Sequence, residues 1–245
     1  MVNLKSSQEI AVMAESGKRL RAVVKDLSSL IKPGITTKEI DEKAEELIKE
    51  QGGESSFKTV SGYLFSTCIP INEQIVHTKP SKRVLKNGDV LTLDIGMLYK
   101  GWHTDYAITK VVGEKSGDLK VDKFLKIGEE TLHHAIKKAK IGNRLGEISE
   151  VIERKITSNG YFIIKELTGH GIGRKLHEDP YVFGFVNRPI NKSTQIKKGL
   201  VIAIEIIYAM GTDAMIYEDD NWSIITKDRS LSACFEHTIA VTDRG

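Results

Sequence analysis

The sequence has little of what several classes of protein require. Its two cysteines, Cys68 and Cys234, form no CxxC pair, which excludes a disulfide framework and a thiolate metal site. No apolar run approaches the roughly 18 residues that span a bilayer, and the N-terminus lacks the apolar segment of a signal peptide. Lys and Arg total 36 against 33 Asp and Glu, without a basic run or a basic patch interleaved with aromatic residues. We therefore expect a cytoplasmic protein that binds neither DNA nor membranes.

What is present is the mixture typical of a soluble globular protein, because 40% of the 245 residues are apolar and 28% are charged. Apolar spacing predicts two groups of helices and two groups of strands. The helices are expected over 7–31, 36–52, 120–140 and 145–158, and the strands within 59–112, 200–209 and 235–241. This order of helices, strands, helices, strands favours an α+β fold over alternating βα units.

The two halves of the chain resemble each other. Shifting residues 32–52 by 108 positions onto 140–160 gives eight identities in 21 positions, where chance on average composition supplies roughly one or two. A shift of 111 aligns 88–95 with 199–206 and places Asp94 on Glu205.

A duplicated unit of two helices and a hairpin explains both matches. Because each copy alone buries little, we expect the copies to pack as one pseudo-twofold antiparallel sheet backed by helices. The sequence thus predicts one domain over residues 1–245, with halves of about 1–115 and 116–245.

Two aspartates are expected to lie together on a hairpin. Asp94 interrupts an apolar run, and a turn at 99–101 returns the chain through Asp105. With a two-residue turn Asp94 faces Asp105 at roughly 5 Å, where two carboxylates repel unless a cation lies between them. A bulge at Gly101 would shift this register by about one residue. The alternative is a pair of surface aspartates on a solvated strand face.

Two glutamates, Glu205 and Glu236, lie in similarly apolar strands. An isolated buried carboxylate is strongly unfavourable, and no Lys or Arg lies near either glutamate in these strands. The four acids therefore indicate a multivalent cation. The alternative is a set of buried ion pairs with distant Lys or Arg.

A glycine-rich segment, TGHGIGRKLHEDP over residues 168–180, carries two histidines. Its glycines are expected to let the backbone approach a ligand where any Cβ would clash. His170 is placed to coordinate a metal, and His177 to contact a substrate. With the four acids, His170 completes an oxygen-rich set that suits two divalent ions sharing carboxylates, and Co, Mn, Fe and Zn all accept such a set.

These residues lie in motifs that resemble those of the type I methionine aminopeptidases, a family with a duplicated pita-bread fold. The motifs span essentially the whole chain in family order. They are NExxxH ending at His77, GDVxxxD ending at Asp94, GWHxD ending at Asp105, GHGIG around His170, HExP from His177, IE ending at Glu205, and TKDRSLSAxFEHT around Glu236. Only 28 positions separate His177 from Glu205, too few for the insertion of type II enzymes. Four residues depart from the family pattern without removing a ligand: Thr78, Thr104, Ile206 and Cys234.

The resemblance implies a metal-binding role for five residues. Asp94 would bind one ion, His170 and Glu205 would bind the other, and Asp105 and Glu236 would bridge both. A hydroxide held between the ions would then attack the first peptide carbonyl.

It also implies roles in catalysis. Glu205 would move the proton to the leaving amine, His77 would contact the nitrogen side of the scissile bond, and His177 would steady the oxyanion. Without the resemblance, His77 is equally well interpreted as a surface histidine at a strand end.

The implied activity is removal of the initiator methionine from nascent proteins whose second residue is small, by a monomer acting near the ribosome. Tyr63, Cys68, Leu176 and Trp222 fall at positions of the methionine pocket, and His77 and His177 add substrate contacts. Val60 and Leu176 stand where aromatics are common, which predicts a wider pocket. The acidic residues that precede Trp222 would also suit a surface loop.

Two other hypotheses remain open. A peptidase of the aminopeptidase P or prolidase type uses the same five ligands, although such enzymes usually carry a large additional N-terminal domain. A catalytically inactive binding module on the same fold usually loses ligands, whereas all five are present here.

Overall fold

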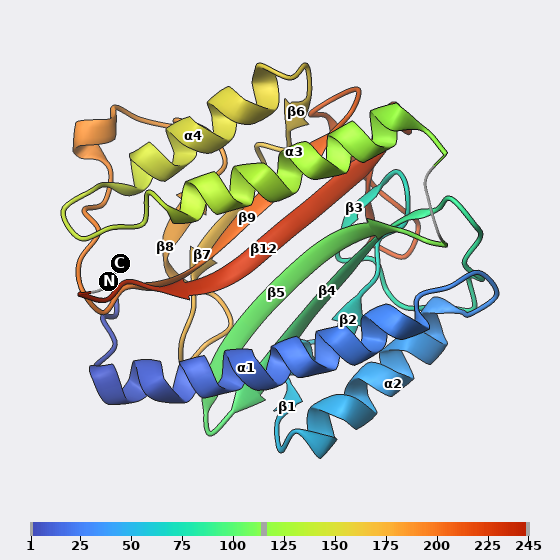
Figure 1. Cartoon of the computed structure of the whole chain (residues 1–245), viewed down its shortest axis with the longest axis horizontal. Coiled ribbons are helices and arrows are strands. Elements are labelled where there is room, and N and C mark those ends of the chain that lie inside the picture. Colours follow the sequence, from blue (N-terminus) through green and yellow to red (C-terminus); the bar gives the residue numbers. More distant parts are fainter. Residues whose placement is uncertain (1, 114–116, 244–245) are drawn as a thin grey trace.

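The computed structural model describes residues 2–113 and 117–243, in which two pairs of helices flank a large sheet (Figure 1). The helices are α1 (Ser7–Leu30), α2 (Thr37–Glu50), α3 (Leu119–Ile136) and α4 (Leu145–Thr157), with single 3₁₀ turns at η1 (Phe57–Thr59) and η2 (Ile190–Lys192). The predicted helices are thus confirmed, except that α3 ends before residue 140. There the backbone N–H groups of Lys138 and Ala139 donate three residues back, to Ala135 and Ile136, so the chain tightens into a turn.

Within the described ranges, the main sheet has nine strands, and its principal order is β1-β4-β5-β12-β9-β7-β8, with β2 on β4 and β6 on β9. Its strands are β1 (Glu54–Ser55), β2 (Thr67–Cys68), β4 (Val90–Tyr99), β5 (Trp102–Val111), β6 (Phe162–Ile163), β7 (Thr168–Gly171), β8 (Glu178–Phe183), β9 (Val201–Ala209) and β12 (Ser232–Ala240). A second sheet has three strands, β3 (Gln74–Val76), β10 (Met215–Tyr217) and β11 (Ile224–Thr226). The α+β class is confirmed.

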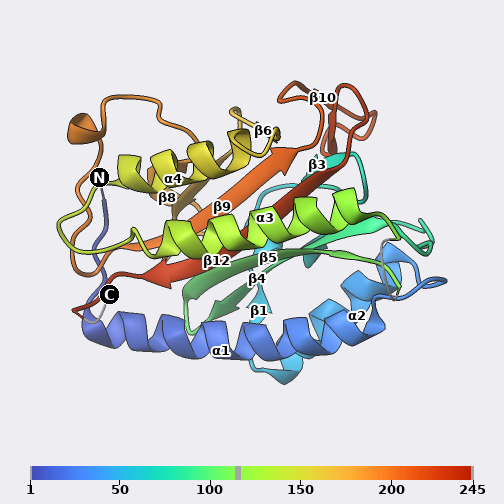
Figure 2. The same cartoon turned by 45° about the horizontal axis from the view of Figure 1, so that its top comes forward.

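The duplication seen in the sequence is visible in this order. Each half supplies a helix pair and two long antiparallel strands, and the halves join where β5 pairs with β12. In Figure 1 the blue helices of the first half and the green and yellow helices of the second lie on opposite sides of this β5–β12 seam, and Figure 2 shows the same arrangement from another angle. The aligned residues Asp94 and Glu205 lie on β4 and β9, which occupy corresponding places on either side of the seam.

A capping box begins each of the first two helices. Ser6 with Glu9 forms a capping box at α1, and Thr36 with Glu39 forms one at α2. In each, the hydroxyl accepts the backbone N–H of the glutamate, while the glutamate accepts the N–H of the capping residue.

The predicted hairpin register between Asp94 and Asp105 is wrong, because the partner of Asp94 lies two residues further along β5. The turn consists of Lys100 and Gly101, both with positive φ (50° and 76°), so Tyr99 rather than Leu98 is the last paired residue of β4. Asp94 therefore lies opposite Ala107, and Asp105 lies opposite Gly96. Because side chains alternate between faces, the two aspartates still project from the same face, diagonally related.

The long strands bury both faces. On the helix side, Leu93 and Ile95 of β4 pack with α1 and α2, and Ile204 and Ile206 of β9 pack with α3 and α4. The residues between them point to the other face, where the acids lie. None of the helices in residues 2–113 and 117–243 combines the length and apolar character needed to cross a lipid bilayer.

Candidate active site

Three of the four predicted acids form a row across the middle of the sheet. Glu236 of β12 lies directly opposite Glu205 of β9 on one side and Ala107 of β5 on the other, and Ala107 lies opposite Asp94 of β4. Asp105 lies two residues from Ala107 along β5. The strand register thus brings four carboxylates from four adjacent strands to one face.

His170 joins this group from β7. It pairs with Ala203, two residues from Glu205, and its Nε2 lies 3.5 Å from Glu205 Oε1. The other ring nitrogen, Nδ1, lies 2.8 Å from the carbonyl oxygen of Gly171. When Nδ1 carries the proton and donates it to that carbonyl, Nε2 is left as a lone-pair donor facing the acids.

The two glycines on either side of His170 have a role in backbone packing that the sequence did not predict. A Cβ on Gly169 would lie 2.4 Å from the carbonyl oxygen of Ala203, and one on Gly171 would lie 2.1 Å from that of Asp179. The glycines therefore allow β7 to pack closely against its neighbours, which places the imidazole.

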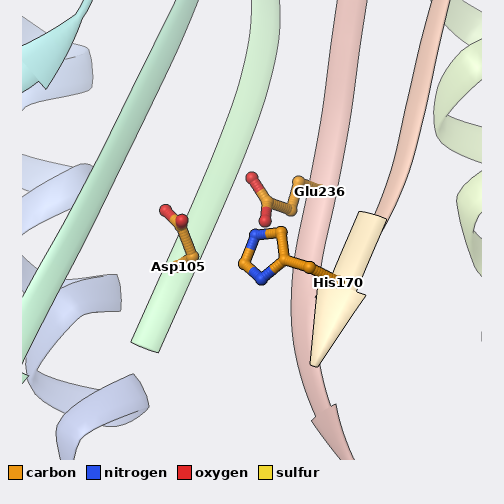
Figure 3. A group of neighbouring side chains, drawn as sticks. All are labelled: Asp105, His170 and Glu236. Carbon is orange, nitrogen blue, oxygen red and sulfur yellow. The ribbon is translucent and has the colours of Figure 1, made fainter. Parts of the chain in front are cut away.

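Asp105, His170 and Glu236 converge most closely, since one potential ligand atom from each lies within 4.8 Å of the others (Figure 3). The three residues are only 6%, 5% and 3% exposed, and Glu236 Oε1 is buried without a hydrogen-bond partner. Among the described residues, no Lys or Arg forms an ion pair with any of the four acids, so distant basic partners do not explain their burial.

Burial and mutual repulsion govern the protonation of this group. Burial raises the pKa of Asp105 to about 7. Burial, reinforced by the neighbouring carboxylates, raises the pKa values of Asp94, Glu205 and Glu236 well above their ordinary range. Burial lowers the pKa of His170 to about 4, which keeps its imidazole neutral. A divalent cation would replace the protons that the acids otherwise need, and carboxylates with a neutral imidazole are suitable ligands for one.

Above the acids lies a cavity of about 480 Å³ that is lined by every residue predicted for the site. These residues are Tyr63, Cys68, His77, Asp94, Asp105, His170, Leu176, His177, Glu205, Trp222 and Glu236. The hypothesis that Asp94 and Asp105 are surface residues on a solvated strand is therefore wrong.

One wall of the cavity is aromatic. The ring of Tyr63 contacts those of Phe57 and Trp222, at centroid distances of 6.4 Å and 5.1 Å, and its hydroxyl lies 3.1 Å from the sulfur of Cys68. Leu176 packs in the same cluster. Trp222 thus packs in the cavity wall although it follows an acidic loop.

The two remaining histidines are accessible from the cavity. His77 follows β3 in the left-handed region with φ of 57°, so it is both a strand-end residue and a cavity residue. The ring of His177 packs edge-on against that of His170, with centroids 4.4 Å apart.

A second, aliphatic wall was not found from the sequence. It contains Val76, Leu167, Ile207 and Cys234, which pack together beside the acids. Strand alternation could have identified Ile207 and Cys234, which lie two residues from Glu205 and Glu236. Val76 and Leu167 carry no such signal. Phe57, Val76, Glu166, Leu167, Thr168, Tyr181 and Ile207 also line the cavity without having been predicted there.

The departures from the family pattern fall in different places. Ile206 is fully buried on the helix side of the sheet. On the same side, the hydroxyl groups of Thr104 and Ser16 share a hydrogen bond of 2.8 Å. Thr78 is buried outside the cavity, with a hydroxyl that has no hydrogen-bond partner. Cys234 alone among the four lines the cavity.

Comparison with known proteins gives a consistent result. The model of metallopeptidase family M24 matches residues 11–243. The chain is 40% identical over 245 residues to methionine aminopeptidase 1 of Bacillus subtilis, covering 100% of this chain and 97% of that protein. The solved structure of methionine aminopeptidase from Thermotoga maritima is similar with a TM-score of 0.95 at 34% identity, covering 99% of this chain and 96% of that one. The prolidase from Pyrococcus furiosus shares the fold, with a TM-score of 0.78 at 24% identity. The match covers 98% of this chain but only 62% of the prolidase.

Proposed function

The chain belongs to metallopeptidase family M24, and from this premise we propose that it is a methionine aminopeptidase that removes the initiator methionine when the second residue is small. The observation that carries the proposal is the convergence of Asp105, His170 and Glu236 at the floor of a partly aromatic cavity. The names of the full-length relatives support the same activity.

Five residues are proposed to hold two divalent ions: Asp94, Asp105, His170, Glu205 and Glu236. Their donor set accepts Co, Mn, Fe or Zn. When bound, such ions polarise a substrate carbonyl and lower the pKa of a water molecule. The unpartnered Glu236 Oε1 and the absence of basic partners among the described residues support this assignment.

The other roles follow from position in the cavity. Glu205 is proposed to hold the proton taken from the attacking water and to deliver it to the leaving amine. His77 is proposed to contact the nitrogen of the scissile bond, and His177 to donate a hydrogen bond to the developing oxyanion.

Two walls define the proposed specificity. The aromatic wall with Tyr63 and Trp222 suits the flexible thioether of methionine, because sulfur packs favourably on ring edges. The aliphatic wall of Val76, Leu167, Ile207 and Cys234 is proposed to face the second residue and to accept only a small one.

We further propose that residues 1–245 work as one domain and as a monomer, in the cytoplasm and near ribosomes. N-terminal methionyl peptides of nascent chains would be the substrates.

The deciding experiment is hydrolysis of Met-Ala-Ser, Met-Lys-Ser and Ala-Pro-Ala by enzyme loaded separately with Co, Mn, Fe or Zn. We expect methionine release from Met-Ala-Ser alone, and only with metal. Cleavage of Ala-Pro-Ala would instead favour the prolidase or aminopeptidase P type. Metal uptake without any turnover would favour a binding module.

A further inference from the structure

The segment that precedes α1 contacts the loop that carries His177. Lys5, just before α1, donates its backbone N–H to the carbonyl of Gly199 at 2.7 Å. Its ammonium group donates to the carbonyl of Asn3 at 2.9 Å and to Glu178 Oε2 at 2.8 Å. The Lys5 side chain is only 1% exposed. In every other Lys or Arg ion pair of the described chain, the basic side chain is at least 32% exposed.

The loop leaves a space that Lys5 fills. A Cβ on Gly173 would lie 2.5 Å from Lys5 Cε and 2.8 Å from Glu178 Oε1, so a larger residue there would displace the lysine or the carboxylate. The ion pair is therefore enclosed against the loop backbone and does not lie on the surface of the loop.

Glu178 connects this pair to the cavity. Its Oε1 accepts the backbone N–H of Lys175 at 3.0 Å, which closes the loop on itself, while its Oε2 accepts Lys5. His177 is the residue directly before it, and its ring packs on His170. The start of the loop is held independently of Lys5, because His103 donates its backbone N–H to the carbonyl oxygen of Gly173 at 2.8 Å.

We propose that Lys5 is a positioning residue for the aminopeptidase reaction, holding Glu178 and thereby keeping His177 in place beside His170. The inference rests on the proposed function. Without Lys5, the Glu178 carboxylate is left largely buried with no counter-charge, and it reaches water only by pulling the end of the loop outward. His177 moves with it, whereas the four acids on their strands do not.

The test compares Lys5→Met, which removes the charge but keeps the length, with Lys198→Met as a matched control. Lys198 pairs with Asp243, and both side chains are more than half exposed. For Met-Ala-Ser at a temperature where each variant is folded, we expect Lys5→Met to lower kcat about 10- to 100-fold, the size of effect produced by a misplaced catalytic group. KM and bound metal are expected to stay near the wild-type values, and Lys198→Met is expected to match the wild type.

A second variant separates positioning from simple stabilisation. Adding Glu178→Gln to Lys5→Met removes the uncompensated charge but keeps an acceptor for the Lys175 N–H, so kcat is expected to recover in part. Should Lys5→Met fail to fold, Glu178→Gln alone is expected to lower kcat in the same way. A lowered melting temperature with unchanged kcat would show that Lys5 only stabilises the fold, and would overturn the proposal.

Hydrogen–deuterium exchange gives an answer that does not depend on turnover. Peptides covering residues 173–178 are expected to exchange faster in Lys5→Met than in Lys198→Met, with β5 and β12 unchanged. Equal exchange in the two variants would refute the inference. If the wild-type protein released no methionine, the proposed function would fail, and the exchange comparison would still decide whether Lys5 holds the loop.

Discussion

Among the four acids, Glu236 gives the clearest indication that the site binds a cation. It is 3% exposed, lies directly opposite Glu205 on the adjacent strand, and has an Oε1 without a hydrogen-bond partner. Like charges this close are destabilising unless they are protonated or neutralised by a positive charge. A divalent ion held by Glu236, Asp105 and His170 provides that charge.

Removing one of the two acids proposed to bridge the ions should therefore affect both ions. We expect Asp105→Asn or Glu236→Gln to abolish turnover of Met-Ala-Ser and to lower bound metal, measured by elemental analysis after dialysis. Glu166→Gln, at the exposed rim of the same cavity, is the control and should keep its metal. Near-normal rates with full metal content in either bridging variant would contradict the assignment.

The histidines should separate into two classes. His77→Ala and His177→Ala are expected to retain metal, because neither belongs to the proposed ligand set. His177→Ala should lower kcat about 10²- to 10³-fold, as for the loss of an oxyanion donor. Loss of metal from either variant would make that histidine a ligand.

At the scale of elements, glycine position decides how closely strands approach. Gly169 in β7 faces the carbonyl of Ala203 at a distance that no Cβ could occupy. Gly17 in the middle of α1 has no atom within 4 Å of where its Cβ would lie. The same residue type is thus required in one element and replaceable in the other.

Urea unfolding of the metal-free protein tests this contrast. Gly17→Ala should stabilise by about 0.5–1 kcal/mol, since glycine in a helix interior is entropically unfavourable. Gly169→Ala should destabilise by roughly 1–3 kcal/mol through overpacking, and should weaken metal binding because His170 is next to it. A stabilised Gly169→Ala protein would show that β7 moves freely and that close packing does not place the imidazole.

Sequence patterns predict these elements well and their register less well. Period 3.6 identifies α1 and α2, and the internal repeat predicts that Asp94 and Glu205 are equivalent. The pairing of Asp94 was misplaced because one turn residue, Lys100, adopts positive φ without being glycine. The aliphatic wall combines strands β9 and β12 with the short strand β3 and with Leu167, which are brought together by tertiary packing, and so only Ile207 and Cys234 had a detectable pattern.

At the scale of the whole molecule, duplication places Asp94 and Glu205 at corresponding positions on the two halves, and the seam between β5 and β12 brings them together with Asp105 and Glu236. The unmetallated protein should then be most sensitive to pH where these acids ionise. Their folded-state pKa values are raised, so the folded state holds more protons than the unfolded one, and stability falls as pH rises.

The window in which this effect is isolated begins above about pH 7.5, where histidines, with an ordinary pKa near 6.5, are mostly neutral in both states. There the acids whose pKa values are raised well above the ordinary range, Asp94, Glu205 and Glu236, determine the slope. Between about pH 7.5 and 8.5 we expect the chelated protein to lose on the order of 1 kcal/mol of unfolding free energy per pH unit. Saturating metal should reduce this slope, because the acids then stay ionised when folded. A slope that is positive, or unaffected by metal, would contradict the account.

The central claim is that the metal-binding cavity accepts an N-terminal methionine and limits the residue after it. The most direct measurement is kcat/KM over a Met-X-Ser peptide series with the metal-loaded protein. The account predicts efficient release for Gly, Ala and Ser at X, slower release for Thr and Val, and none for Lys, Leu or Phe. Equal kcat/KM for Met-Ala-Ser and Met-Lys-Ser would contradict it.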